Sequence, residues 1–206
     1  MHVLFVTADP GSRSFVASLA ERYLAGVQSH VTAIIERVDL FREAFDPRMT
    51  EGDLALYRSE GPIPEDVRRE QLRIERADVL ILAFPIYWWS MPAVMKGWID
   101  RVFTNGWAFG TQDRFSGPLA TKSVRLIATG GSKPGAYEQH GYRTAIAAQI
   151  EHGIFHFSGV RDLRTHLFLD VENGDRAARL RNIATAFELG HALGAGYSTR
   201  IPTTAS

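Results

Sequence analysis

Five short apolar runs recur along the chain, each rich in β-branched or aliphatic residues and long enough for one strand. The third run is uninterrupted over residues 79–84, as expected for a strand buried on both faces. The pattern predicts strands at 3–8, 31–40, 78–84, 124–129 and 163–169.

Stretches with helical spacing of apolar residues separate these runs. They predict helices at 15–28, 64–76, 92–103, 144–157 and 176–193. Strands that alternate with helices favour a parallel sheet with helices on both faces. The sequence therefore predicts an α/β protein of one domain, residues 1–206, with a five-stranded parallel sheet in a doubly wound three-layer sandwich.

Composition narrows the classes of partner. Hydrophobic residues make up 45% of the 206 residues, enough for a sizeable core. Lys plus Arg and Asp plus Glu each number 23, which disfavours nucleic acid or an anionic membrane as partner. The chain has no cysteine, which excludes disulfides, thiolate metal ligands and thiol catalysis, and no metal site is expected. The N-terminal apolar run breaks at Asp9-Pro10, too early for a signal core or a membrane span, so a cytoplasmic protein is expected.

Ligands of open parallel sheets bind beyond the carboxyl ends of the strands, which selects the loops at 9–14, 85–91 and 130–141. The first loop enters a helix with Arg13 and Ser14 at its mouth, a pattern suited to phosphate. A plain helix cap by Ser14 is the alternative. The loop lacks the glycine patterns of Rossmann dinucleotide sites and of P-loops.

The second loop carries three bulky rings in a row, Tyr87, Trp88 and Trp89, between Pro85 and Pro92. The prolines fix both ends of the segment, and the rings are too large for an ordinary tight turn. Aromatic side chains and backbone N–H groups at this edge suit a planar conjugated ligand. A hydrophobic cluster that covers the end of the sheet is the alternative.

The third loop begins with Gly130-Gly131 and continues to Tyr137 and His140. Glycines allow the backbone to approach a flat ligand closely, and the two later side chains are candidate proton donors beside it. A solvated loop is the alternative, although a connection of this length in a compact domain is more often functional.

With these loops in view, the chain resembles the flavodoxin-like NAD(P)H dehydrogenase (quinone) family of two-electron reductases. The resemblance runs from residue 3 to about residue 184. It rests on FPIYWWSMPAVMKGWIDRVF at 84–103, on TGG at 129–131 followed by Tyr137, and on HGIFHFSGV at 152–160. It implies a flavodoxin-like three-layer fold, a bound flavin, NAD(P)H as electron donor and a quinone-like acceptor.

The resemblance also implies individual roles. The implied cofactor-binding residues are Arg13, Ser14 and Phe15 at the ribityl and phosphate groups, Pro85, Ile86, Tyr87, Trp88 and Trp89 at the isoalloxazine, and Thr129, Gly130, Gly131 and Tyr137 at its pyrimidine side. Arg179 matches an arginine that reaches an adenine-side phosphate, which favours FAD over FMN.

The resemblance places Phe109 and Phe157 in a substrate pocket that is closed by the partner subunit of a homodimer. An apolar surplus around NGWAFG and HGIFHFSG independently favours dimerisation. The alternative is that both phenylalanines belong to the core of a single chain.

Two positions depart from the family pattern. Asp9 stands where members often carry histidine, and Arg143 stands six residues after Tyr137, at the place of the catalytic histidine. Tyr137 is the expected proton donor, assisted either by Arg143 as a fixed charge or by His140 as a proton relay. The aligned position favours Arg143.

The leading hypothesis is a ping-pong NAD(P)H:quinone oxidoreductase. Azo- or nitro-compound reduction would use the same site. A function of another class is that of an ancillary regulator of a potassium-efflux system, the one case in which a membrane partner is expected. The neutral charge and the large aromatic loop argue against a flavodoxin-type electron carrier.

Overall fold

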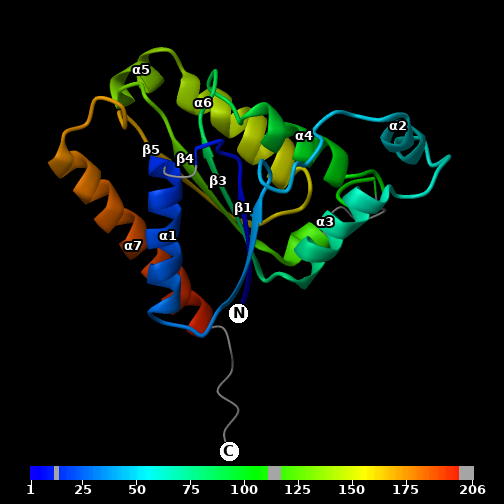
Figure 1. The fold of residues 1–206 in the computed structure, drawn as a ribbon, viewed down its shortest axis with the longest axis horizontal. Helices are drawn as coiled ribbons and strands as arrows, with labels where there is room; N and C mark the ends of the chain where they lie inside the picture. Colours follow the sequence, from blue (N-terminus) through cyan, green and yellow to red (C-terminus); the bar gives the residue numbers. More distant parts are fainter. Residues whose placement is uncertain (12–13, 111–116, 200–206) are drawn as a thin grey trace, which may run out of the picture.

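A computed structural model describes residues 1–11, 14–110 and 117–199 of the protein. Five parallel strands form one sheet in the order β2-β1-β3-β4-β5 (Figure 1). This order is that of flavodoxin-like folds and confirms the predicted class. The strands are β1 (His2–Thr7), β2 (Ile34–Asp39), β3 (Val79–Pro85), β4 (Ser123–Thr129) and β5 (Asp162–Phe168).

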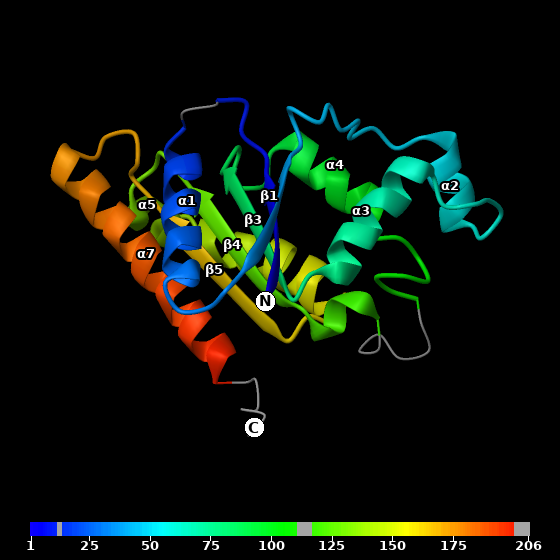
Figure 2. The same ribbon diagram turned by 60° about the horizontal axis from the view of Figure 1, so that its bottom comes forward.

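Helices cover both faces of the sheet. On one face α1 (Phe15–Gln28) and α7 (Arg176–Ser198) lie side by side (Figure 2). The other face carries α3 (Glu65–Arg76), α4 (Ala93–Val102) and α6 (Tyr142–Ile146) with its continuation η2 (Ala147–His156). Two buried clusters, one on each side of the sheet, make the three layers.

Every predicted strand and helix is present, with some ends shifted. Strand β2 begins at Ile34 rather than at residue 31, and the helix predicted at 144–157 begins at Tyr142 and is π-helical over residues 147–156. Helix α7 continues to Ser198 rather than ending at residue 193. Glycine interrupts the apolar spacing at residue 194, where the helix passes close to α1. A Cβ on Gly194 would stand 2.7 Å from the carbonyl oxygen of Val27 on α1.

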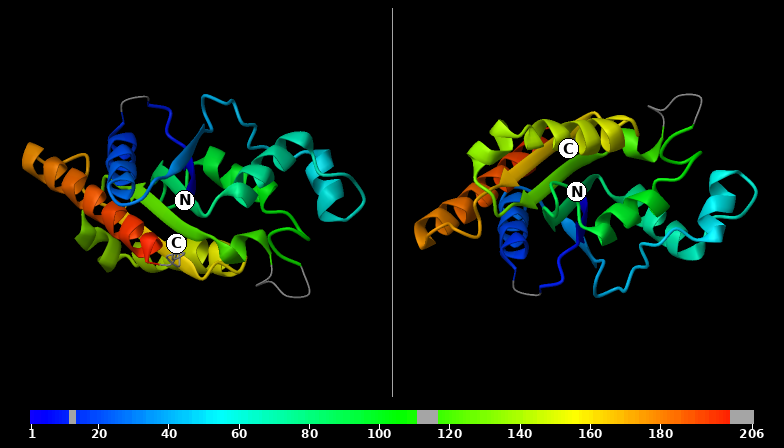
Figure 3. Two further views of the ribbon diagram at one scale, coloured as in Figure 1. Left: turned by 90° about the horizontal axis from the view of Figure 1, so that it is seen from below. Right: turned by 90° about the horizontal axis from the view of Figure 1, so that it is seen from above.

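Within the described residues, three short helices were not predicted: α2 (Glu51–Tyr57), η1 (Pro118–Thr121) and α5 (Pro134–Gln139). Helix α2 lies at the end of the molecule remote from α7 (Figure 3). It starts with a capping box, in which Thr50 and Asp53 each accept a hydrogen bond from the other's backbone N–H. The buried Arg101 of α4 holds it in place through Nε, 2.8 Å from Asp53 Oδ2.

Candidate functional site

The loops after β1, β3 and β4 meet at the carboxyl edge of the sheet. Pro85 of β3 pairs with Thr129 of β4, and the N–H of Ile86 donates to the Thr129 carbonyl at 2.7 Å. Ala8 after β1 donates to the carbonyl of Ala83 in β3 at 3.1 Å. The three sequence segments selected from the strand ends are therefore neighbours in space.

The first loop forms the helix cap. Ser14 Oγ accepts from the N–H of Ala17 at 3.2 Å, the capping alternative of the sequence analysis. Asp9 Oδ1 accepts from the N–H of Gly11 at 2.7 Å, so a carboxylate already occupies one donor of the loop. Arg13 lies outside the described residues.

The second loop is a tight turn of an unusual kind. Tyr87 and Ser90 exchange two backbone hydrogen bonds of 3.0 Å, and the residues between them, Trp88 and Trp89, have φ values of 49° and 57°. Both therefore lie in the left-handed region that bulky residues seldom adopt. The rings were expected to be too large for an ordinary tight turn, and the turn they form has this unusual conformation. It accommodates them because the Trp88 ring points into open space with 89% of the residue exposed. Among the described residues, no acceptor pairs with the N–H of Trp88 or Trp89.

The Trp89 ring connects the second loop to the third. It stacks on Tyr142 with ring centroids 4.1 Å apart and planes 27° apart. Tyr142 also meets the edge of Tyr137 at 6.0 Å and lies 5.4 Å from the His140 ring. The sequence pointed to Tyr137 and His140 but gave Tyr142 no role, because a stack between distant loops leaves no local pattern.

The two glycines of the third loop are required by their neighbours. A Cβ on Gly130 would stand 2.6 Å from the hydroxyl oxygen of Tyr137, and one on Gly131 would stand 2.6 Å from the carboxyl carbon of Glu172. Tyr137 is buried, and burial raises the pKa of its hydroxyl above the ordinary value. The hydroxyl therefore stays protonated at neutral pH and is available as a donor.

The two candidates for assisting Tyr137 are both exposed. Neither the His140 nor the Arg143 side chain forms a hydrogen bond or ion pair with another described residue. Of the two, only His140 contacts the aromatic stack, through Tyr142. The choice between a relay and a fixed charge therefore stays a prediction.

Arg179 and Phe15 come together from the two ends of the described chain. The guanidinium of Arg179, in the first turn of α7, lies 4.8 Å above the ring of Phe15, the first residue of α1. The pair shares the end of the helical layer that carries the first loop. A cation is therefore held beside the candidate phosphate region.

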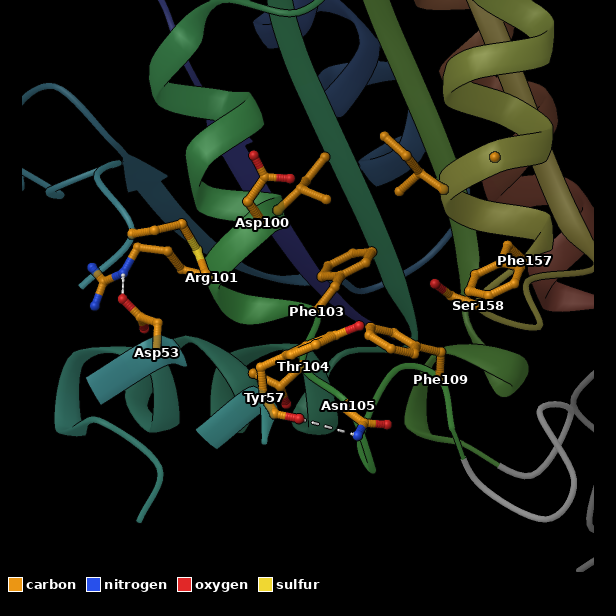
Figure 4. Close-up of a pocket in the computed structure, with 14 residues that line it drawn as sticks. Asp53, Tyr57, Asp100, Arg101, Phe103, Thr104, Asn105, Phe109, Phe157 and Ser158 are labelled. Atoms are coloured by element: carbon orange, nitrogen blue, oxygen red, sulfur yellow. Dashed lines mark hydrogen bonds and ion pairs between the residues drawn. The ribbon is translucent and has the colours of Figure 1, made fainter. Parts of the chain in front are cut away.

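Phe109 and Phe157 line a separate cavity of about 420 Å³ between α2, α4 and η2 (Figure 4). Their ring centroids are 6.0 Å apart. Phe157 is 51% exposed, so the alternative that both side chains are core is wrong for Phe157. The cavity shares no lining residue with the three loops. A substrate pocket that Phe109 and Phe157 close across a dimer interface therefore stays a prediction.

Other kinds of site find no support in the described part of the chain. No group of three or more acidic or histidine side chains there is placed to hold a metal ion. In residues 1–11, 14–110 and 117–199, no helix has the length and apolar character needed to cross a membrane.

Comparisons with known proteins agree with this architecture. A family model described as flavodoxin-like fold matches residues 1–188. An uncharacterized NAD(P)H oxidoreductase of Haemophilus influenzae is 31% identical over 188 residues, covering 90% of this chain and 92% of that protein. The ribosyldihydronicotinamide dehydrogenase [quinone] of Pongo abelii is 32% identical over 202 residues, covering 88% of this chain and 87% of the relative.

A solved structure extends the likeness to three dimensions. The NAD(P)H:quinone oxidoreductase from Methanothermobacter marburgensis superposes with a TM-score of 0.86 at 27% identity, over 94% of this chain and 98% of that one. From the match over residues 1–188 and the relatives similar along nearly their whole length, the chain belongs to the flavodoxin-like fold family, with quinone oxidoreductases among its relatives.

Proposed function

We propose that the protein is a flavin-dependent NAD(P)H:quinone oxidoreductase that transfers two electrons from NAD(P)H to a quinone or similar acceptor. The observation that carries the proposal is the Trp88–Trp89 turn at the carboxyl edge of the sheet, whose two N–H groups pair with no acceptor among the described residues. The names of the relatives support the same activity.

The residues present fit the ring system of a flavin. The turn offers two backbone donors for ring heteroatoms, and Tyr87 and Trp88 offer exposed aromatic surface for a flat ligand. When bound, the flavin supplies the redox chemistry, taking up a hydride and returning two electrons. The chain would contribute binding, orientation and the protonated hydroxyl of Tyr137, which at the pyrimidine side of the flavin would stabilise developing negative charge.

FAD is the proposed flavin. Support comes from the Arg179 guanidinium, held over Phe15 at 4.8 Å next to the first loop, where it suits an additional phosphate. The carboxylate of Asp9 disfavours a phosphate at the same loop, because it adds a negative charge there. The proposal therefore depends on Arg179 outweighing Asp9.

The test begins with the protein made in flavin-replete cells. Heat releases the flavin and chromatography identifies it, with FAD expected and FMN alone contradicting the choice of flavin. Steady-state rates with NADH or NADPH and a quinone should follow a ping-pong law, and an azo dye as acceptor measures the neighbouring activity. Stopped-flow mixing that shows no reduction of bound flavin by either nicotinamide would refute the proposed function.

A further inference from the structure

The turn at residues 87–90 is in a conformation that its own sequence disfavours. Two adjacent tryptophans occupy the positions at which such turns favour glycine or asparagine. Bulky side chains with positive φ cost free energy and persist only where the surroundings impose them. Something outside the turn must therefore hold it.

Two contacts from one segment beyond β4 hold the turn. The Trp89 ring stacks on Tyr142 at 4.1 Å, and Ser90 Oγ donates to Gln149 Oε1 at 2.9 Å. Tyr142 begins α6 and Gln149 lies in η2, so both partners belong to one continuous helical segment. Trp88, in contrast, stays 89% exposed and adds little restraint.

The same tyrosine contacts the proposed proton donor. Tyr137 presents its edge to Tyr142 at 6.0 Å with the planes 83° apart, the geometry in which aromatic pairs attract. Tyr137 is fixed on its other side by Gly130. Tyr142 therefore lies between the turn with the unpaired N–H groups and the buried hydroxyl.

We propose that Tyr142 is a positioning residue that clamps the Trp88–Trp89 turn against the loop carrying Tyr137, and so presets both for a flavin ring. The part that concerns flavin rests on the proposed function. The clamp itself is a property of the protein without cofactor. A preset turn binds more tightly because less conformational freedom is lost on binding.

The test compares Tyr142→Leu with Tyr142→Phe. Leucine removes the stack, whereas phenylalanine keeps the ring and loses only the hydroxyl. In the protein without flavin, hydrogen exchange of the two hydrogen-bonded amides of the turn, those of Tyr87 and Ser90, should accelerate at least tenfold in Tyr142→Leu and stay within twofold of wild type in Tyr142→Phe. The flavin Kd should rise about tenfold in Tyr142→Leu and change less than twofold in Tyr142→Phe.

Phe187→Leu is the matched control. Phe187 is a half-buried ring of α7 that contacts Arg22 and His191, away from the three loops. The Phe187→Leu substitution should leave both the amide exchange of the turn and the flavin Kd unchanged. Should Tyr142→Leu fail to fold, Ser90→Ala removes only the hydroxyl that bonds Gln149, and a smaller change in the same direction is expected.

A second substitution tests the role of strain. Trp88→Gly relieves one positive φ value, so adding Tyr142→Leu to it should accelerate exchange less than Tyr142→Leu does in the wild type. Equal acceleration in the two backgrounds would overturn the role of strain, and unchanged exchange in Tyr142→Leu would overturn the clamp. Faster exchange with an unchanged flavin Kd would overturn the proposal that the clamp prepares the turn for flavin binding. A wild-type protein that takes up no flavin would end the proposed function, while the exchange measurements would still decide the clamp.

Discussion

At the scale of single residues, Tyr137 and Gly130 form one unit. The hydroxyl oxygen of Tyr137 lies where even a methyl group on Gly130 would be too close, so each residue restricts the other. Burial keeps the hydroxyl protonated, yet a tyrosine is a weak acid and transfers its proton slowly without help. A neighbouring cation or imidazole should therefore assist it.

We predict that Arg143 assists as a fixed charge. Arg143→Ala should slow reduction of the flavin by NAD(P)H about tenfold or more, with a rate that stays flat from about pH 6 to 8, because arginine does not deprotonate there. His140→Ala should have a small effect. Stopped-flow measurement of the reductive half-reaction across this pH range decides between them.

Tyr137→Phe serves as the reference, and it should slow the same step while the flavin stays bound. A pH-dependent step that is lost only in His140→Ala would instead identify His140 as a proton relay. Full speed in Tyr137→Phe would remove the tyrosine from the mechanism altogether.

His166 gives a prediction about stability and pH. It lies on β5 beneath Tyr23, with ring centroids 5.7 Å apart, and burial together with Arg125 and Arg164 lowers its pKa to about 4. In the unfolded chain His166 has a pKa near 6.5. Between about pH 6.5 and pH 4, His166 therefore binds a proton in the unfolded state but not in the folded state. The contribution of neutral His166 to the free energy of unfolding is therefore fully present above about pH 6.5 and is lost as the pH falls towards 4.

His166→Gln should remove this dependence. Between pH 7 and pH 4.5, the wild type should lose about 2 kcal/mol more of its free energy of unfolding than the variant does. Urea titrations at the two pH values measure the difference. His152→Gln, at an exposed histidine of η2, is the matched control, and equal losses in all three proteins would contradict the cause assigned here.

At the scale of elements, apolar periodicity predicted all five strands and five helices because each buries a face against the layers. The short helices α2 and α5 were not predicted because they bury few residues and are too short for a repeated apolar spacing. The Thr50–Asp53 capping box was the available local signal for α2. The Trp89–Tyr142 stack joins residues 53 positions apart, beyond the reach of any local pattern.

Helices α1 and α7 pack so closely that glycine is required at their contact. A Cβ on Gly190 would stand 1.9 Å from the carbonyl oxygen of Tyr23, which is fixed backbone. Gly190→Ala should therefore force the helices apart and lower the free energy of unfolding by about 2–3 kcal/mol. Chemical denaturation measures the loss.

Gly196 on the same helix is the matched control. A Cβ there would meet nothing within 4 Å, so Gly196→Ala should be neutral or stabilise by about 0.5–1 kcal/mol through helix propensity. Similar changes in the free energy of unfolding for the two substitutions would show that the close approach of the helices does not cause the loss of stability.

At the scale of the whole molecule, apolar side chains surround the cavity that contains Phe109 and Phe157. Among the residues that line it, the exposed fractions are 60% for Tyr57, 51% for Phe157 and 47% for Met49. Single exposed apolar residues are ordinary, but several around one apolar cavity indicate a surface that another molecule covers. In the expected homodimer, Phe109 and Phe157 of one copy would close the pocket formed by the three loops of the other.

We predict a homodimer that uses this surface. Phe157→Asp places a charge within the contact, so light scattering should show a shift towards monomer, and the rate with a quinone should fall about tenfold or more because the pocket loses a wall. Ile34→Asp, at a 70% exposed position on the edge strand β2, should change neither mass nor rate. Flavin release and chromatography should recover comparable flavin from both variants, which separates loss of the pocket from loss of the cofactor. A wild-type protein that is monomeric at all concentrations and still reduces quinones rapidly would show that Phe109 and Phe157 do not act across an interface.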